Sequence, residues 1–282
     1  PWGYKFSWSP RAVMLAGRRP ARFLRDGKEV AVPGDDIFNH SWALEVDGEG
    51  VFEIYPNGDS LRYIRPYGLD GAQGVFRGTL RYPGWCATMG AAVRLGLFDL
   101  EPRDWPEGTT YADFTSRLLP GNGSVLQRAA DFLQVSGDSE VLARLEWAGL
   151  FSDRPLPERQ AAPIDVFGNR LVKLMMYQPG ERDQVLLKHI FTVQYPDGSR
   201  AEVRSRLVEL GDPWGDTAMA KTVSLAAGTG TRLIVEKGIQ AVGVQLPTLR
   251  EIYEPVLEEL ADRGIALQEM HIKSFRGPFA TP

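Results

Sequence analysis

Cysteine is nearly absent from this 282-residue sequence, in which Cys86 is the only one. A single cysteine cannot form a disulfide within the chain, and it cannot supply the ligands of a zinc site by itself. The three histidines, His40, His189 and His271, stand near no other metal ligand at a recognised spacing. We therefore expect no metal site, and the low cysteine content is typical of a reducing compartment.

Long apolar runs and a strong charge imbalance are absent too. No run approaches the roughly 20 apolar residues that a membrane-spanning helix needs, and no basic stretch followed by an apolar one forms a leader. The formal net charge is -4, from 32 lysines and arginines against 36 aspartates and glutamates, and the two signs are interspersed. These features predict a cytoplasmic protein that binds neither membranes nor nucleic acid.

Motifs for nucleophilic catalysis are also absent. No Gly-x-Ser-x-Gly elbow occurs in the sequence. Cys86 follows Trp85 in an apolar segment, where a small buried hydrophobic residue is expected. The extended run around His189 favours a structural role for that histidine. The catalytic acid and base therefore remain unassigned.

Helix and strand signals alternate in the first 82 residues. Ser9-Pro10 is typical of a helix start, and apolar residues as far as Leu24 predict a helix that ends at Asp26-Gly27. Alternating charged and apolar residues predict a strand at 52–55, before a turn. This mixture favours an α/β arrangement.

The segment 83–162 has helical periodicity instead. Apolar residues recur three and four apart, as in Val141, Leu142, Leu145 and Ala148. Short polar or glycine-containing stretches divide the segment into several helices. We expect an all-α helical subdomain inserted into an α/β domain.

The clearest local signal comes in the last third of the chain. The runs 184–195 and 199–210 are rich in β-forming residues and flank Pro196-Asp197-Gly198, which predicts a β-hairpin. Helices are expected at 217–237 and 249–263, because each ends with a cation followed by glycine.

Together these signals predict an α/β (α+β) fold. Residues 1–82 and 163–282 are expected to form one discontinuous domain, whose mixed β-sheet has helices on one face, and 83–162 to form the helical insert. A sheet face without covering helices tends to be buried against a second copy of the chain. We therefore expect a homodimer through the β-sheet.

Arg81 is the first candidate for binding a substrate. It follows an apolar strand and precedes the helical segment that begins at Trp85. Ligands of open α/β sheets bind beyond the carboxyl ends of strands, and a guanidinium offers paired donors to a carboxylate. The alternative is an arginine that pairs with a surface acid.

Four segments together resemble one family. They are Tyr4 to Arg11, Tyr55 to Ser60, Arg77 to Tyr82 and Ala218 to Thr222. Their order and content are similar to the C-terminal domain of saccharopine dehydrogenase, the L-glutamate-forming saccharopine reductase type. The resemblance implies an NAD(P)-dependent oxidoreductase that acts on the CH-NH bond of an amino-acid conjugate in lysine and α-aminoadipate metabolism. It also implies that this domain forms the dimer.

The resemblance implies residues that bind a small amino-acid substrate. Arg81 would take a carboxylate, Thr79 would hydrogen bond an amine or a carboxylate, and Leu80 would contribute backbone groups. A second segment of the family lies near the same cleft and contains Lys5, Ser7 and Trp8.

One position departs from the family. Gly58 stands where the family carries an arginine, and the loss of a guanidinium would leave a second substrate carboxylate without a partner. Arg62 and Arg65, shortly after this turn, are the candidates to replace it. Two alternatives stay open: a non-catalytic binding or dimerisation module, and a relative that acts on a different amino-acid or polyamine conjugate.

A nicotinamide site has little support in these residues. Such a site needs a strand, a glycine-rich turn and a helix N-terminus, whereas Gly228-Thr229-Gly230 lies inside a predicted helix. In the resembling family the nucleotide-binding domain precedes the region that begins here at Pro1, and the sequence has no initiator methionine. We therefore expect NADP(H) or NAD(H) in the full-length enzyme, no cofactor bound by this chain, and no activity of the chain alone.

Overall fold

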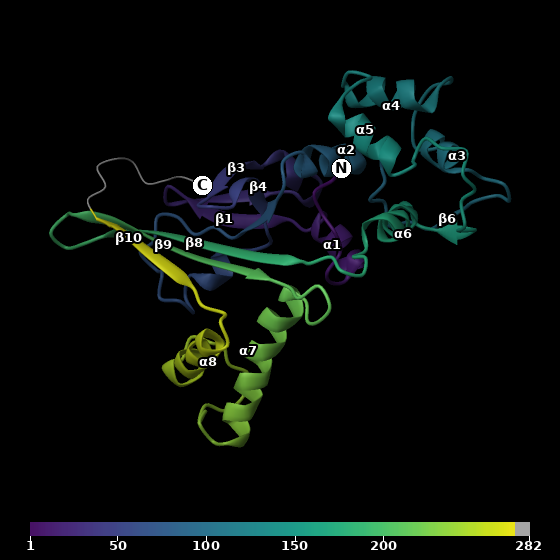
Figure 1. Ribbon diagram of the computed structural model, residues 1–282. Coiled ribbons are helices and arrows are strands. Elements are labelled where there is room, and N and C mark those ends of the chain that lie inside the picture. Colours follow the sequence, from purple (N-terminus) through teal and green to yellow (C-terminus); the bar gives the residue numbers. More distant parts are fainter. Residues whose placement is uncertain (274–282) are drawn as a thin grey trace. The chain divides into compact units, whose positions relative to one another are not determined.

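The computed structural model describes residues 1–273, which form two compact units. The first unit comprises Pro1–Leu61 and Gln73–Met176, and the second comprises Arg62–Ala72 and the chain from Tyr177. Each unit has its own strands and helices, which are labelled in Figure 1.

The strands of the first unit form three small antiparallel sheets. Their members are β1 (Ala21–Arg25) with β2 (Lys28–Val32), β3 (Trp42–Val46) with β4 (Gly50–Pro56) and β5 (Gly78–Arg81), and β6 (Arg103–Asp104) with β7 (Gln160–Ala161). The second of these sheets has the order β3-β4-β5. Strand β5, which ends at Arg81, is therefore at the edge of its sheet.

The first helix is shorter than the sequence predicts. Helix α1 spans Pro10–Ala16, and the hydroxyl of Ser9 accepts a hydrogen bond from the amide of Ala12, so the predicted start is confirmed. Residues 21–25, however, form strand β1 and not the end of this helix. The reason is Asp26-Gly27, whose φ angles of 50° and 72° make the two-residue turn that joins β1 to β2.

The first unit contains one more 3-10 helix and five more α-helices. They are η1 (Gly34–Asn39), α2 (Trp85–Arg94), α3 (Tyr111–Ser116), α4 (Val125–Leu133), α5 (Glu140–Trp147) and α6 (Pro163–Met175). Helix α2 packs against η1 and α5, and α1 packs against α6. Trp85, Met14 and Phe167 are among the largest fully buried side chains and belong to one hydrophobic core. The predicted helical segment 83–162 contains α2 to α5.

The second unit is built on the predicted hairpin, which is confirmed. Strands β8 (Gln184–Gln194) and β9 (Arg200–Leu210) pair along their full length, and β10 (Gln268–Lys273) pairs with the other edge of β9. Gly198 has a φ of 81° in the connecting turn, a conformation that glycine adopts without strain. A short 3-10 helix, η2 (Leu61–Tyr63), stands where the chain passes from the first unit to the second.

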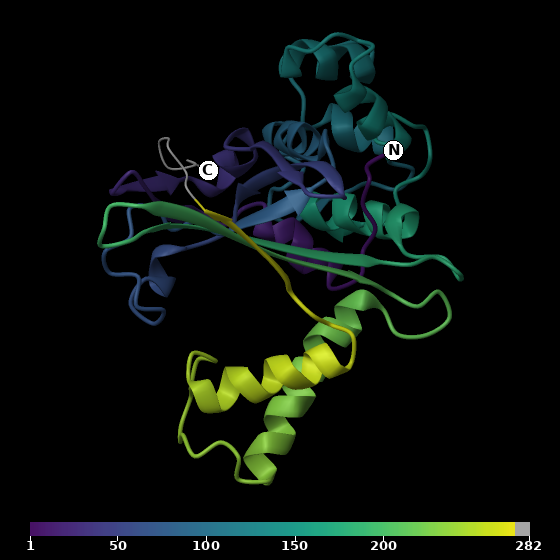
Figure 2. The same cartoon turned by 60° about the vertical axis from the view of Figure 1, so that its left-hand side comes forward.

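Two helices complete the second unit. Helices α7 (Ala218–Val235) and α8 (Arg250–Asp262) pack against each other, and α7 also contacts β8 and β9. In both Figure 1 and Figure 2 the two helices lie on the same side of the three-stranded sheet. The buried carboxylate of Asp183 caps α7, because it accepts hydrogen bonds of 2.7 Å and 2.9 Å from the amides of Ala218 and Met219.

The predicted α/β class is confirmed, but the expected single mixed sheet is not. The strands belong to separate antiparallel sheets, three in the first unit and one in the second. Alternation in the sequence predicts that a segment is extended, and it does not say which strand that segment pairs with. The expected division at residues 82 and 162 stays a prediction, and the compact units have their boundaries at residues 61, 72 and 176.

Candidate substrate-binding site

Strand β5 carries two of the predicted site residues on one face. In the pairing of β4 with β5, Arg81 is opposite Glu53 and Thr79 is opposite Tyr55, so these four side chains share a face of the sheet. Leu80 is opposite Ile54 and points its side chain to the other face. Leu80 can therefore offer only backbone groups to a ligand on the Arg81 face, as the sequence predicts.

The turn after Arg81 is held by a carboxylate from the neighbouring strand. Glu53 accepts hydrogen bonds of 2.8 Å from the amides of both Gly84, the N-cap residue of α2, and Cys86, the second residue of the helix. A negative charge at the N-terminus of a helix is also favoured by the helix dipole. Gly84 has a φ of 89°, and a Cβ there would collide with the guanidinium of Arg144 on α5. The path from β5 to α2 is thus determined by packing on both sides.

The guanidinium of Arg81 lies against two neighbouring aromatic rings. Its Cζ is 4.8 Å from the ring centre of Tyr4 and 5.4 Å from that of Trp85, both distances at which cation-π attraction acts. One terminal nitrogen donates a 2.8 Å hydrogen bond to the carbonyl of Leu80. The aromatic rings therefore hold the cation in one place.

Arg81 has no acidic partner in the part of the chain that the structure describes. Its Nε is buried, and among residues 1–273 no acceptor lies within hydrogen-bonding distance of it. A buried donor of a charged group is costly to leave unpaired. The alternative of an arginine paired with a surface acid is not what the structure shows, and an anionic ligand would supply the missing acceptor.

Tyr4 and Trp85 contribute two more buried donors without acceptors. Within the described chain, the Tyr4 hydroxyl and the Trp85 indole nitrogen are buried and donate no hydrogen bond, although the Trp8 indole interacts with the Tyr4 oxygen. The two rings are 4.7 Å apart, centre to centre. Tyr4 belongs to one of the motifs in the sequence, but nothing in the motif singles it out. Its position beside Arg81 depends on the bridge between Phe6 and Met176, which no local pattern in the sequence indicates.

Arg81 also acts on the protonation of its neighbours. Burial raises the pKa of Tyr4 and of Tyr55, and in both cases the charge of Arg81 works in the opposite direction. Burial, together with the nearby carboxylate of Glu53, raises the pKa of Cys86 to about 12. The Cys86 thiol is therefore neutral near pH 7, and it cannot act as a nucleophile in that form.

The turn with Gly58 has a guanidinium beside it. A Cβ on Gly58 would be 3.7 Å from a terminal nitrogen of Arg77, whose side chain also donates to the carbonyl of Asn57 at 3.1 Å. The side-chain amide of Asn57 in turn donates a hydrogen bond of 2.8 Å to the hydroxyl of Thr79. Position 58 thus lacks the arginine of the family, but the guanidinium of Arg77, which directly precedes β5, lies beside Gly58.

The other predicted site residues are placed as follows. Lys5 and Ser7 flank the buried Phe6, whose amide donates to the carbonyl of Met175 at 2.8 Å. Trp8 is 45% exposed. A substrate contact for these residues stays a prediction. The same holds for Arg62 and Arg65, which belong to the second unit.

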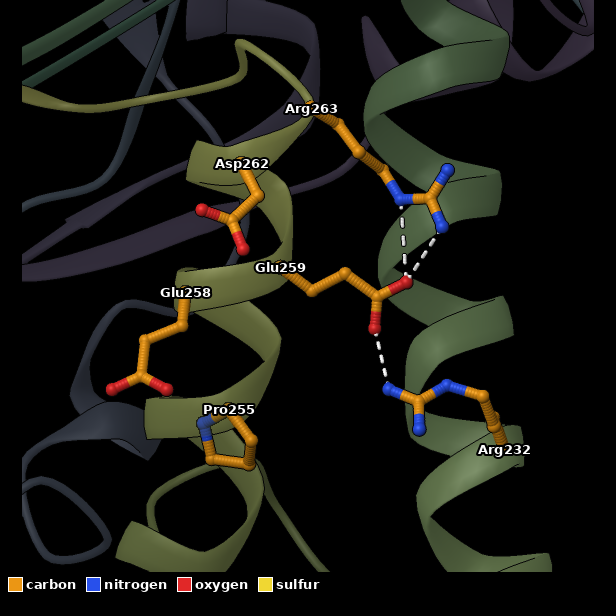
Figure 3. Close-up of a pocket in the computed structure, with 6 residues that line it drawn as sticks. All are labelled: Arg232, Pro255, Glu258, Glu259, Asp262 and Arg263. Carbon is orange, nitrogen blue, oxygen red and sulfur yellow. Dashed lines mark hydrogen bonds and ion pairs between the residues drawn. The ribbon is translucent and has the colours of Figure 1, made fainter.

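A groove on the second unit is a weaker candidate. It is lined by residues of α8 and by Arg232 of α7, and Figure 3 shows its side chains. The carboxylate of Glu259 pairs with Arg232 at 2.6 Å and with Arg263 at 2.8 Å. Because these charges satisfy each other, we assign no substrate to the groove.

The described residues contain neither the side-chain cluster of a metal site nor a membrane-spanning helix. Across the described chain, no group of three or more His, Cys, Asp or Glu side chains is arranged to hold a metal ion. None of the helices in residues 1–273 is both long enough and apolar enough to cross a bilayer.

Comparison with known proteins agrees with the resemblance seen in the sequence. The family model of the saccharopine dehydrogenase C-terminal domain matches residues 1–265. The chain belongs to this family. The solved structure of apo histidine-tagged saccharopine dehydrogenase (L-Glu forming) from Saccharomyces cerevisiae has a TM-score of 0.86 and 31% identity, over 96% of this chain and 63% of that one. The resemblance stated from four short segments is thus confirmed.

Curated relatives carry two kinds of name. The saccharopine dehydrogenase [NADP(+), L-glutamate-forming] of Schizosaccharomyces pombe is 32% identical over 280 residues, which are 95% of this chain and 62% of the relative. The mitochondrial alpha-aminoadipic semialdehyde synthase of Bos taurus is 34% identical over 276 residues, 94% of this chain and 29% of the relative. The chain thus spans less than two thirds of these relatives. Its homologues are oxidoreductases of lysine metabolism.

Proposed function

We propose that this chain is the substrate-binding and dimerisation portion of an NADP-dependent saccharopine dehydrogenase. The complete enzyme would act on the CH-NH bond of an amino-acid conjugate such as saccharopine. The observation that carries the proposal is Arg81, a cation that packs against two aromatic rings at the end of β5 and whose buried Nε has no acceptor among the described residues. A substrate carboxylate is the group that this arrangement fits.

Thr79 and Leu80 would assist Arg81 in different ways. The Thr79 hydroxyl lies on the same face and is held in place by Asn57. Leu80 keeps the Arg81 guanidinium in position, because its carbonyl accepts a hydrogen bond from it. These contacts fix the direction in which the remaining donors of Arg81 point.

Arg77 is the residue that we propose for a second substrate carboxylate. It lies beside Gly58, where the family carries an arginine, and it belongs to the same unit as Arg81. This placement supports saccharopine, which carries more than one carboxylate, over a substrate with a single one. The competing interpretation is that no residue replaces the family's arginine at Gly58. In that case the chain would be part of a non-catalytic module, or of a relative that acts on a different amino-acid or polyamine conjugate.

The nucleotide is proposed to bind outside this chain. Gly228 and Gly230 lie within α7, between Thr217 at its N-cap and Glu236 at its C-cap, so they form no phosphate-binding loop. The chain's own residues therefore do not fit a dinucleotide there. The names of the fungal relatives favour NADP(H) over NAD(H) in the complete enzyme. We propose that the chain alone binds no nucleotide and is inactive.

A homodimer through the β8-β9-β10 sheet is part of the proposal. One face of this sheet is apolar and partly open, with Leu187, Phe191 and Val193 exposed by 42%, 51% and 36%. His189 is on the same face, and burial lowers its pKa, which keeps the ring neutral near pH 7. Burial of these side chains against a second copy would remove apolar surface from water.

A cytoplasmic location is also proposed. The single cysteine supports a reducing compartment. The mitochondrial name of the animal relatives points to the alternative. Cell fractionation followed by detection of the protein would distinguish the two.

The experiment that tests the function is steady-state kinetics of the full-length protein with saccharopine and NADP. Turnover that depends on Arg81 supports the proposal. Absence of saccharopine turnover in a folded full-length protein would leave the binding-module interpretation.

A further inference from the structure

Packing gives no reason for the hydroxyl of Tyr4. The Tyr4 ring lies 5.4 Å from the ring of Phe6 and 4.7 Å from that of Trp85, centre to centre, and a phenylalanine would make the same contacts. Yet this hydroxyl is buried, and its interaction in residues 1–273 is with the Trp8 indole, which is itself a donor, so the hydroxyl proton has no acceptor. Buried hydroxyls are nearly always hydrogen-bonded, because an unpaired one destabilises the folded chain. A ligand atom would complete this site.

We propose that the Tyr4 hydroxyl is a second donor to the substrate carboxylate that Arg81 binds. The inference rests on the proposed function and names a residue that sets the affinity and specificity of the same site. Two buried donors without acceptors, the Arg81 Nε and the Tyr4 hydroxyl, belong to side chains in direct stacking contact. A carboxylate has two oxygens, each of which accepts more than one hydrogen bond, so it can take both donors at once.

The two donors come from distant parts of the sequence and recognise different features. Arg81 supplies charge and a planar pair of donors, whereas Tyr4 supplies a neutral donor with a fixed direction. Burial favours the protonated form of Tyr4, in spite of the opposing charge of Arg81, so the hydroxyl retains the proton that it donates. A bound carboxylate adds a negative charge and favours the protonated phenol further.

Two neighbouring polar groups fit this role less well. The Tyr55 hydroxyl interacts with that of Thr79 and is thereby occupied. Trp85 is only 2% exposed, and its indole packs edge-on against Trp2 at 5.9 Å inside the core. Tyr4 is therefore the neighbouring donor for which the described chain provides no acceptor.

The test compares Tyr4→Phe with Tyr82→Phe in the full-length protein, with saccharopine as the probe. Each variant removes one hydroxyl near Arg81. Tyr4 contacts Arg81 in space, whereas Tyr82 follows it in the sequence, is 47% exposed and packs against Phe52. For Tyr4→Phe we expect KM for saccharopine to rise about tenfold while kcat stays within about twofold and the thermal midpoint does not fall. For Tyr82→Phe we expect wild-type kinetics.

A spectroscopic measurement separates ligand contact from a structural role. Saturating saccharopine should raise the pKa of one tyrosine, followed through tyrosinate absorbance during alkaline titration, and Tyr4→Phe should lack this change. An unchanged KM for Tyr4→Phe, in an enzyme whose Arg81→Lys variant has a raised KM, overturns the inference but not the proposed function. Unchanged KM values in both variants overturn the proposed function, and this inference with it.

Discussion

The carboxylate of Glu53 binds both Gly84 and Cys86, with 2.8 Å from each oxygen to one backbone nitrogen. The amides at the start of a helix have no partner within it, so Glu53 on β4 takes the role that a capping residue usually has. Because Arg81 is the register partner of Glu53, the same strand pair positions Arg81 and the helix that follows it.

Substitution of Glu53 by glutamine should destabilise the first unit. A glutamine side chain has one oxygen and one NH2 group, and the NH2 group cannot accept a hydrogen bond from either amide. We expect the free energy of unfolding to fall by about 1–3 kcal/mol in urea denaturation. Glu258→Gln is the matched control, because Glu258 is exposed on α8 and should change stability by less than about 0.5 kcal/mol. Equal effects would contradict the capping role.

Gly84→Ala and Gly121→Ala form a second matched pair. Both glycines have positive φ, 89° and 83°, so backbone strain in each alanine variant should lower the free energy of unfolding by about 1–2 kcal/mol. A Cβ at position 121 meets nothing within 4 Å, whereas one at position 84 meets the guanidinium of Arg144. Gly84→Ala should therefore cost more, and urea denaturation of the two variants measures the difference. If the two costs are equal, Arg144 moves aside freely and does not hold the turn.

Arg81→Ala should weaken substrate binding without unfolding the protein. Loss of a charge-assisted carboxylate pair should lower kcat/KM for saccharopine by about 2–4 kcal/mol, chiefly through KM, and Arg81→Lys should recover only part of it. NADPH affinity in the full-length protein should stay the same. Arg19→Ala, at an exposed arginine before β1, serves as the control. Wild-type kinetics of Arg81→Ala would leave the site unassigned.

Stability at alkaline pH should depend on Cys86. Its pKa in the folded chain is about 12, above the reference of 9.0, so the folded state holds the thiol proton more tightly than the unfolded state does. The stability that this proton gives is complete below about pH 9 and is lost as the pH rises toward about 12. Cys86→Ala should therefore lose less stability than wild type as the pH rises from about 9 to about 11 in urea denaturation. If the free energy of unfolding of the two proteins falls equally with pH, ionisation of the thiol does not affect stability in this range.

Phe191→Lys should break the proposed dimer. Phe191 is 51% exposed on the apolar face of β8, where a lysine would be buried against the second copy. Light scattering at micromolar concentration should give a dimer for the wild type and a monomer for this variant. Thr192→Lys, one residue further along and on the opposite face, should remain a dimer. A monomeric wild type would refute the proposal directly.

Local signals in the sequence account for several elements correctly. Ser9-Pro10 starts α1, and Pro196-Asp197-Gly198 joins β8 to β9, because capping and turn geometry depend on residues that are neighbours in the chain. Asp26-Gly27 is also a local signal, but glycine after a polar residue is common both at a helix end and in a two-residue hairpin turn, and the structure shows the hairpin.

By itself, the sequence determined the family, the α/β class and the position of Arg81 at the end of a strand. These depend on residue identity and on spacing along the chain. Only the tertiary structure decided that Tyr4 lies against Arg81, that Arg77 lies beside Gly58, and that the strands divide into separate sheets. The reason is physical: which side chains meet, and which buried donors remain unpaired, depends on pairings between segments far apart in the chain, and such pairings leave no periodic or local mark in the sequence.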